Sequence, residues 1–385
     1  MQRDGWATRL NGSDRRSPPD RDEIELSVFG AGYGECLVLH LTENQWVVID
    51  SCSGVDSGVS IATEYLTELK VPISSAVRLV VATHYHDDHI GVLGEFFERS
   101  KSARFGCSMA LRTNDWLTLL EVYRHYLQDG GSGVDQLRRV MNELAARAQR
   151  KEVAAPIFCI EGRVIREPIL PAGAALTCLA PSDAAVVAMH AKIHEELLPR
   201  ANRRRLRVPG LDRNDGAVVF SVQVGAASAL LGADLEERNT PGLGWRVILD
   251  HLAPGSLLHD GFKIPHHGSP TGFHPEVWER LITKNGWAVV TPYNRQKNPL
   301  PGIEDCKRIA AMTNEAFITS MPGWARFRHL DVAVRKTAEE TTLKIAPEQP
   351  KHGLVRFRRS VKPNENWKVE LFENAKRLSE VLIAV

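Results

Sequence analysis

Three short apolar segments, far apart in the sequence, each end in side chains that can bind a metal ion. RLVVAT (78–83) leads into HYHDDHIG, ALLGAD ends at Asp234, and GFKIP leads into HHGS. A continuous apolar run such as RLVVAT is typical of a strand buried on both faces beneath helices. Because side chains that share a metal site must meet at one edge of a sheet, these segments favour a layered α/β fold.

The remaining strand and helix patterns fit two sheets packed face to face with helices outside. IELSVF, CLVLHL and QWVVID, between residues 24 and 50, predict an antiparallel strand meander. Further strands are predicted in ALTCLA, in AVVFSVQV and SALLGAD with a turn at Gly225, in WAVVTP and in AFITS. Helices are predicted over 61–69, 184–197, 275–281 and 304–311. The predicted fold class is α/β, a four-layer αββα sandwich.

Composition divides the chain into a leader, a main domain and an appendage. Residues 1–22 mix charge, Gly, Ser and a Pro pair, which predicts a mobile leader. The main domain is predicted over 23–321, with a helical insertion at about 111–150 that is broken by the DGGSG tract. In 322–385 the pattern changes to β-like LVRFRR and WKVELF and a final short helix, which predicts a small β-rich C-terminal appendage.

Composition also excludes several classes of protein. The six cysteines are scattered without CxxC pairs, which argues against a zinc knuckle or a disulfide framework. No apolar run approaches the roughly 18 residues of a membrane-spanning helix, and the N-terminus is too charged for a secretory signal. With a net charge of +1, any affinity for nucleic acid would have to come from a local basic cluster. We therefore expect a cytoplasmic protein without membrane insertion.

The segment HYHDDH places four candidate metal ligands where a strand gives way to a loop: His84, His86, Asp88 and His89. Imidazole and carboxylate groups suit Zn²⁺, Mn²⁺ or Fe²⁺, and the HxHxDH spacing sends alternate residues to two neighbouring metal positions. The alternative is a solvated polar loop with surface histidines.

The other two strand ends supply further candidate ligands. A carboxylate can bridge two cations about 3.5–4 Å apart, so Asp234 is the predicted bridging ligand. Taken alone, an Asp before a helix is more often an N-cap, and a His–His pair is more often structural. Their order after HxHxDH favours metal binding. Sequence does not fix which of His266 and His267 is the ligand, and we favour His267.

Together these motifs resemble the metallo-β-lactamase superfamily. The wording VFGAGYGECLVLHL, WVVIDSC, NDGAVVFSV, LLGAD and IPHHGS is similar to the hydrolase domain of ComEC-type competence proteins and its stand-alone relatives, over about residues 24–320. The resemblance implies two metal sites, one formed by His84, His86 and Asp234 and the other by Asp88, His89, Asp234 and His267. It also implies that Asp50 braces the metal loop and that His266 supports a ligand or donates a proton.

One turn departs from the superfamily pattern. Many members have a histidine in a GHT-like turn before the AVVFSV-type strand, whereas this chain has Asn214 and Asp215. ComEC-like sequences resemble this one in having Asn there, so the change weakens one metal site or favours a harder cation such as Mn²⁺. His190 and His194, spaced i,i+4 on a predicted helix, are another source of a ligand, although exposed helix faces often carry such histidines.

These residues predict a hydrolase that binds two divalent metal ions, Zn or Mn, and uses a hydroxide shared between them. Asp88 is predicted to orient the nucleophile, and His266 or Ser269 to hydrogen-bond the phosphate or leaving group. Ser269 also fits a simple turn residue, which we favour. The basic cluster NRRRLR, with Arg203, Arg204, Arg205 and Arg207, is predicted either to track a phosphodiester backbone or to be a solvated loop.

The favoured function is a phosphodiesterase or nuclease acting on nucleic acid or a nucleotide. One alternative is a hydrolase of carboxylic ester, lactone, thioester or amide bonds. Another is a metal-stabilised scaffold in a multi-protein system, for example in cellular defence, with a protein partner bound through the insertion or the appendage. RFRR at 356–359 and Trp367 predict a stacking surface or an ordinary half-buried strand, and we favour the strand.

Overall fold

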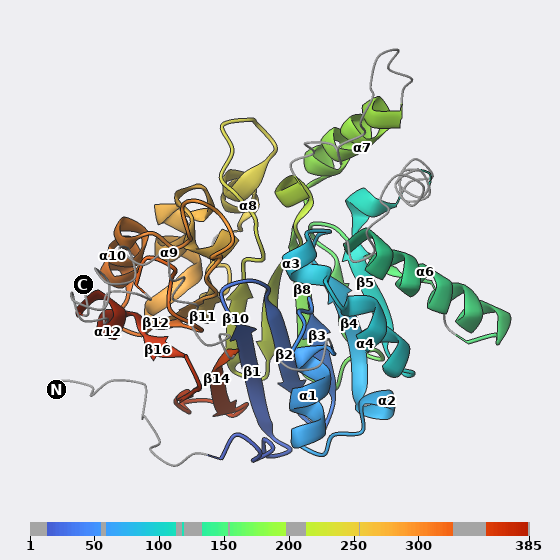
Figure 1. The fold of residues 1–385 in the computed structure, drawn as a ribbon, viewed down its shortest axis with the longest axis horizontal. Helices are drawn as coiled ribbons and strands as arrows, with labels where there is room; N and C mark the ends of the chain where they lie inside the picture. Colours follow the sequence, from blue (N-terminus) through green and yellow to red (C-terminus); the bar gives the residue numbers. More distant parts are fainter. Residues whose placement is uncertain are drawn as a thin grey trace, which may run out of the picture.

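The structure, a computed structural model, describes residues 14–54, 59–112, 118, 133–152, 155–197, 213–253, 255–325 and 352–383. Two eight-stranded sheets form its centre (Figure 1). In order, the first sheet contains β15 (Lys368–Phe372), β14 (Gly353–Ser360), β1 (Glu23–Gly30), β2 (Cys36–Leu41), β3 (Trp46–Ile49), β4 (Val77–Ala82), β5 (Arg104–Ser108) and β6 (Ile157–Cys159). The second contains β16 (Lys376–Arg377), β13 (Ala316–Ile318), β12 (Ile282–Val290), β11 (His259–Lys263), β10 (Ala227–Leu231), β9 (Val219–Val224), β8 (Ala174–Ala180) and β7 (Val164–Ile165).

Helices cover the outer faces of both sheets (Figure 1). Those on the side of the first sheet are α1 (Ile61–Glu68), α2 (Ile73–Ala76) and α4 (Leu93–Arg99), with α6 (Gly133–Gln149) packed against α4 and α7 (Asp183–Leu197) against η1 (Met109–Leu111) and η2 (Arg213–Gly216). Those packed on the second sheet are α8 (Gly244–His251), α9 (Pro275–Leu281), α10 (Ile303–Met312) and α12 (Leu378–Ile383). The other short helices are α3 (Asp87–Ile90), η3 (His266–Gly268) and η4 (Pro270–Gly272).

Three apolar cores separate four layers. One lies between the first sheet and its helices and includes Phe96, and another lies between the second sheet and its helices and includes Trp245. The third fills the space between the two sheets and includes Leu26 and Val289. Alternate residues of the sheets point to opposite faces, so both faces of most strands are buried, as in β4. The structure confirms the predicted four-layer αββα sandwich.

Strand register explains why the predicted ligands meet. β10 and β11 are parallel and pair Leu231 with Lys263, so Asp234 and His266 each follow three residues beyond a paired position. In the first sheet the parallel strands β3 and β4 pair Ile49 with Val81, which puts Asp50 beside the start of the HYHDDH segment. Because parallel strands end at the same edge of a sheet, each sheet delivers polar side chains to one edge.

The predicted meander and hairpin are both present. β1, β2 and β3 are successive antiparallel neighbours, and β9 and β10 turn at Gly225, whose φ is +57°. A positive φ is easily adopted by glycine, which has no side chain to clash with the backbone. The sequence did not predict β5, whose residues RFGCS lack a run of β-branched side chains.

The C-terminal strands extend the two sheets rather than lying beside them. β14 pairs with β1 along its whole length, from Glu23 with Ser360 to Gly30 with Gly353, and β16 pairs with β13. Phe357 is buried and stacks on Trp287, with ring centroids 3.8 Å apart. RFRR is therefore part of a buried strand, as favoured, and not a stacking surface. The division of the chain at residues 22 and 321 stays a prediction.

Part of the predicted mobile leader is bound to β14. The buried Arg356 donates through Nη1 to the carbonyl of Arg15 at 3.0 Å, and Arg358 donates to the carbonyl of Ser17 at 2.5 Å. Residues 1–13, and most of the first half of the predicted insertion, lie outside the described residues, but its second helix is present as α6. Among the residues described, no helix has the length and apolarity needed to cross a membrane.

Candidate metal centre

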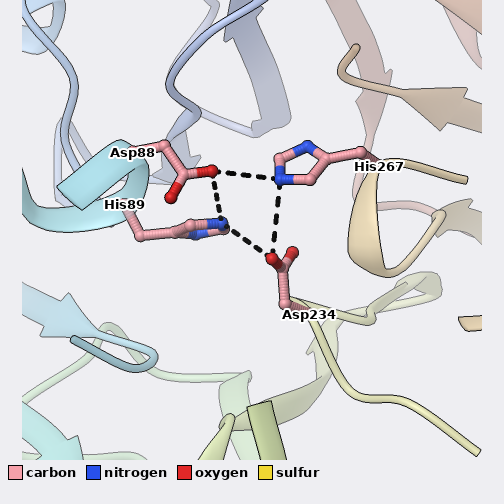
Figure 2. Close-up of side chains that lie close together, drawn as sticks. All are labelled: Asp88, His89, Asp234 and His267. Carbon is pink, nitrogen blue, oxygen red and sulfur yellow. Dashed lines mark hydrogen bonds and ion pairs between the residues drawn. The ribbon is translucent and has the colours of Figure 1, made fainter. Parts of the chain in front are cut away.

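The predicted ligands from three distant stretches converge at the edge where the two sheets end. Figure 2 shows Asp88, His89, Asp234 and His267 pointing toward a common centre. Their ligand atoms all lie within 4.8 Å of one another, and all four residues are buried. We call this set the four-residue cluster. His84, His86 and Asp234 satisfy the same criterion and form the three-residue cluster. Asp234 belongs to both, as expected of a bridging ligand.

One carboxylate oxygen of Asp234 lies close to histidines of both clusters. Its Oδ2 is 3.3 Å from Nε2 of His89, 3.5 Å from Nε2 of His267 and 3.8 Å from Nε2 of His84. Asp88 closes the four-residue cluster, with its Oδ2 3.1 Å from Nε2 of His267. These separations leave the donor atoms facing one another around a small polar space.

The outer nitrogens of the ligand histidines are held by other groups. Nδ1 of His89 donates to Oδ2 of Asp50 at 2.7 Å, and Nδ1 of His267 donates to the carbonyl of Thr291 at 3.0 Å. Each bond fixes the ring so that Nε2 faces the cluster, which is how proteins orient metal-binding imidazoles. In the described part of the chain, Nε2 of His89 and Oδ1 of Asp234 are buried and form no hydrogen bond. Such buried orphan atoms, of the donor types that bind zinc or manganese, fit a cation.

Asp50, for which the resemblance implied a bracing role, lies at the end of β3 and hydrogen-bonds the HYHDDH loop. It is fully buried and has a φ of +59°, a conformation that is unusual and costly for a residue with a side chain. Its Oδ1 accepts from the backbone N–H of Thr83 at 2.8 Å, and its Oδ2 accepts from the Thr83 hydroxyl at 2.7 Å as well as from His89. It therefore ties the end of β3 to the start of the HYHDDH loop and touches the ligands rather than the metal position.

His267, not His266, belongs to the four-residue cluster. Both residues have a positive φ, +46° and +53°, so the backbone turns sharply after β11 and sends the two rings in different directions. Nδ1 of His266 lies 3.3 Å from Oε1 of Glu236 and 3.0 Å from the hydroxyl of Thr271. Its Nε2 lies 3.5 Å from Nδ2 of Asn214. Glu236 was not singled out from the sequence.

Asn214 and Asp215 lie in η2 and have different surroundings. Asn214 is buried and donates to Oε1 of Glu236 at 2.6 Å, while its Oδ1 makes no hydrogen bond within the described residues. Both oxygens of Asp215 face cations, Lys192 at 3.1 Å and Arg238 at 2.8 Å. Neither residue belongs to a ligand cluster found in the described residues. His190 and His194 are also absent from those clusters.

Ser269 begins a short helix, as the favoured interpretation predicted. Its hydroxyl accepts from the backbone N–H groups of Thr271 and Gly272 and so caps η4. The predicted substrate-binding residues Arg203, Arg204 and Arg205, together with Arg207, lie outside the described residues.

Burial and charge shift the pKa values of the two clusters in opposite directions. Burial lowers the pKa of His86 to about 4, and it holds that of His84 well below its usual range. Burial also opposes the protonation of His267, but Asp234 and Asp88 raise its pKa to about 10. The four-residue cluster therefore contains an excess of negative charge that protons or cations must neutralise. The three-residue cluster offers neutral imidazoles.

A cavity of about 300 Å³ opens over the clusters. His86, Asp88, Asp234, His266 and His267 are among the residues that line it. Arg213, Tyr33 and Tyr293 also line it. Arg213 is held by the carbonyl of Tyr85 at 3.1 Å, and the rings of Tyr33 and Tyr293 have centroids 5.6 Å apart.

The structure also reveals residues that sequence reasoning missed. Glu35 and Lys263 form a buried ion pair behind the four-residue cluster, with Nζ and Oε2 2.6 Å apart. A charged residue inside the apolar segment GFKIP was the available signal, because a buried charge needs a partner. Nothing local in the sequence identifies Glu35 as that partner.

Comparisons with known proteins found one matching sequence family and several distantly similar solved structures. The sequence model described as the metallo-beta-lactamase superfamily matches residues 29–121. No curated protein sequence matches the chain. Among solved structures, the chain is similar to the metallo-beta-lactamase fold protein YhfI from Bacillus subtilis, at 11% identity and a TM-score of 0.30, covering 63% of this chain and 70% of that one.

Two further solved structures are similar at the same low level. A Cronobacter sakazakii metallo-beta-lactamase with a HARLDQ motif has 14% identity and a TM-score of 0.30, covering 56% of this chain and 62% of that one. The hydrolase AbOPH of the beta lactamase superfamily has 13% identity and a TM-score of 0.26, covering 52% and 55%. Scores this low do not bear on the site or on a substrate. Over residues 29–121 the chain is similar to the metallo-beta-lactamase superfamily.

Proposed function

We propose that this protein is a hydrolase that binds two divalent metal ions, Zn or Mn, and cleaves phosphodiester bonds. The observation that carries the proposal is the sharing of Asp234 between two ligand clusters on the floor of an open cavity. Two cations held this close would lower the pKa of a shared water and neutralise charge on a phosphate oxygen. The imidazole and carboxylate donors suit both candidate metals.

The protein side chains have distinct parts in this proposal. Asp88 lines the cavity and orients the attacking water through its carboxylate. Arg213, in the cavity wall, binds a phosphate oxygen with its guanidinium. Glu236 and Thr271 hold His266 at Nδ1, and in this proposal its Nε2 exchanges the 3.5 Å contact with Nδ2 of Asn214 for a hydrogen bond to the leaving group.

The choice of a phosphodiester rests on two observations. Arg213 supplies a cation beside the clusters, as phosphate recognition requires. The sequence similarity of the segments that carry the candidate ligands to ComEC-type hydrolase domains also favours a phosphodiester. Fold alone does not decide substrate, so neither the superfamily nor the sandwich enters this choice.

A substrate screen tests the proposal. The purified protein would be incubated with Mn²⁺ or Zn²⁺ and given bis-p-nitrophenyl phosphate, labelled DNA and labelled RNA, beside a panel of lactones and peptides. We expect cleavage of the phosphodiesters that is lost in Asp234→Asn and kept in Asp215→Asn, a buried carboxylate outside the clusters. Cleavage confined to the carbonyl substrates would discard the phosphodiesterase.

A further inference from the structure

A buried ion pair lies between the two sheets, directly behind the four-residue cluster. Glu35 precedes β2 of the first sheet, and Lys263 ends β11 of the second. Their charged atoms are 2.6 Å apart, and each side chain is only 1% exposed. Removing two charges from water costs several kcal/mol per ion, and apolar replacements of such pairs are often neutral or stabilising. Stability therefore does not account for this pair, whereas its contacts with the candidate metal ligands suggest a role.

On the side of the first sheet, Glu35 touches the loop that carries two ligands. Its backbone N–H donates to the carbonyl of Asp88 at 2.9 Å. Its Oε1 lies 4.0 Å from Nδ1 of His89, the nitrogen that donates to Asp50. Glu35 therefore holds the backbone of one candidate ligand, and its carboxylate lies beside the ring of the next without hydrogen-bonding it.

On the side of the second sheet, the pair reaches the other two ligands. Nζ of Lys263 donates to the carbonyl of Ala233 at 3.2 Å, one residue before Asp234. The hydroxyl of Thr291 donates to Oε2 of Glu35 at 2.5 Å, and the carbonyl of Thr291 accepts from Nδ1 of His267 at 3.0 Å. The ion pair is thus linked to all four residues of the four-residue cluster. Each link is either a direct contact or passes through one intervening residue.

We propose that Glu35 and Lys263 are positioning residues that align the ligand loops of the two sheets for metal binding. The ligands come from different sheets, whose mutual packing is apolar and therefore has little directional preference. Hydrogen bonds from a shared buried pair are directional, so they fix the loops relative to one another. The inference rests on the metal centre of the proposed function and not on its substrate.

The test compares two pairs of charges in the same protein. The double variant Glu35→Leu with Lys263→Met removes the positioning pair but keeps an apolar filling. The control, Arg356→Met with Glu370→Met, removes another buried pair, 2.5 Å apart, whose hydrogen bonds in the described chain reach no cluster residue. Three properties would be measured for each double variant. Zinc affinity would be obtained by chelator competition, the geometry of the site from the visible spectrum with bound Co²⁺, and folding from the unfolding of the metal-free protein.

We expect the positioning double variant to fold but to bind zinc about 10- to 100-fold more weakly, the range seen when groups that orient metal ligands are removed. Its Co²⁺ spectrum should also change, which a purely structural role would not produce. The control pair should leave both readings as in the wild type. Wild-type zinc affinity and spectrum in the positioning variant would overturn the inference.

Thr291→Val provides a second variant in case the double variant does not fold. It removes the hydroxyl that is bonded to Glu35 and that also lies 3.5 Å from Nδ1 of His267, and it keeps the carbonyl that accepts from that nitrogen at 3.0 Å. We expect weaker zinc binding and an altered Co²⁺ spectrum, and an unchanged pair of readings would again contradict the inference. A wild-type protein that binds no metal at all would instead contradict the proposed function, so the two failures are distinguishable.

Discussion

The two ligand clusters share Asp234 but are built differently. The four-residue cluster is entirely buried, carries two carboxylates, and has its histidines held by Asp50 and the carbonyl of Thr291. The three-residue cluster has one carboxylate and includes His86, which is only partly buried. Asn214 belongs to neither cluster and contacts Glu236 and His266 instead. Asp50 braces His89 directly and His84 only through the Thr83 hydroxyl, so the comparison indicates one more strongly charged, directly braced cation position and one weaker position.

The shared carboxylate should give the largest effect. Asp234→Asn removes an anionic ligand from both clusters, so we expect the bound metal to fall from about two equivalents to nearly none. Hydrolysis should fall by more than the roughly 100-fold that loss of an orienting group alone causes. Metal analysis of the purified variant beside Asp215→Asn checks this. Retention of one full equivalent would show that the clusters do not depend on a common ligand.

The bracing residue of the four-residue cluster should come next. Asp50→Asn weakens the bond that orients His89 and frees the Thr83 loop, so metal affinity should fall about 10- to 100-fold. The loss should concern the four-residue cluster more than the other. Asp305→Asn, a buried carboxylate that caps α10, is the matched control. Titration with zinc would resolve the two affinities, and equal losses at both would remove the distinction between the clusters.

The pH dependence of zinc affinity should differ between the two clusters. The pKa of His267, raised to about 10 by Asp234 against its burial, means that a cation must displace a proton there. The pKa of His86, lowered to about 4 by burial, means that no proton is displaced there near neutrality. Affinity at the four-residue cluster should therefore rise by about tenfold per pH unit for each proton released. Zinc titrations between pH 6 and 9 measure this slope.

The same shift predicts the stability of the metal-free protein. A folded-state pKa above the unfolded value means that protonated His267 stabilises the fold fully below its ordinary value of 6.5. This contribution is lost as the pH rises through about 10. The metal-free protein should therefore become less stable from pH 7 to 10, while the zinc-bound protein should not. A flat profile for the metal-free protein would contradict the charge assignment.

Restoring a histidine at position 214 should have the smallest effect. Asn214→His would add an imidazole at the turn where the resemblance implies one, and it should strengthen the weaker affinity by a few-fold while the stronger affinity stays the same. The gain should be small because Glu236 and His266 already hold this side chain. Zinc titration of the variant beside the wild type measures both affinities. Weaker binding at both metal positions would mean that the site needs the asparagine at position 214.

The convergence of the candidate ligands was predictable from sequence because its signals are local. His84 to His89 follow a buried apolar strand within a few residues, and Asp234 and His267 follow strands in the same way. Parallel pairing then brings strand ends together whatever the intervening sequence is. The choice of His267 over His266 depended on the positive φ of both residues, which the pattern of side chains does not reveal.

Partners separated by hundreds of residues could not be predicted. Glu35 meets Lys263, and β1 pairs with β14, only because the finished sheets bring these segments together. Neither Glu35 nor the strand around Phe357 has a neighbouring residue that specifies its partner. The burial of arginines in β14 was hidden for the same reason, since alternation with apolar residues ordinarily predicts exposed charges.

Anomalous diffraction from crystals grown with zinc or manganese tests the central claim most directly. We predict two peaks about 3.5–4 Å apart on either side of Asp234. The stronger peak should touch Asp88, His89 and His267, and the weaker one His84 and His86. A single peak, or peaks that leave Asp234 uncoordinated, would contradict a shared two-metal centre.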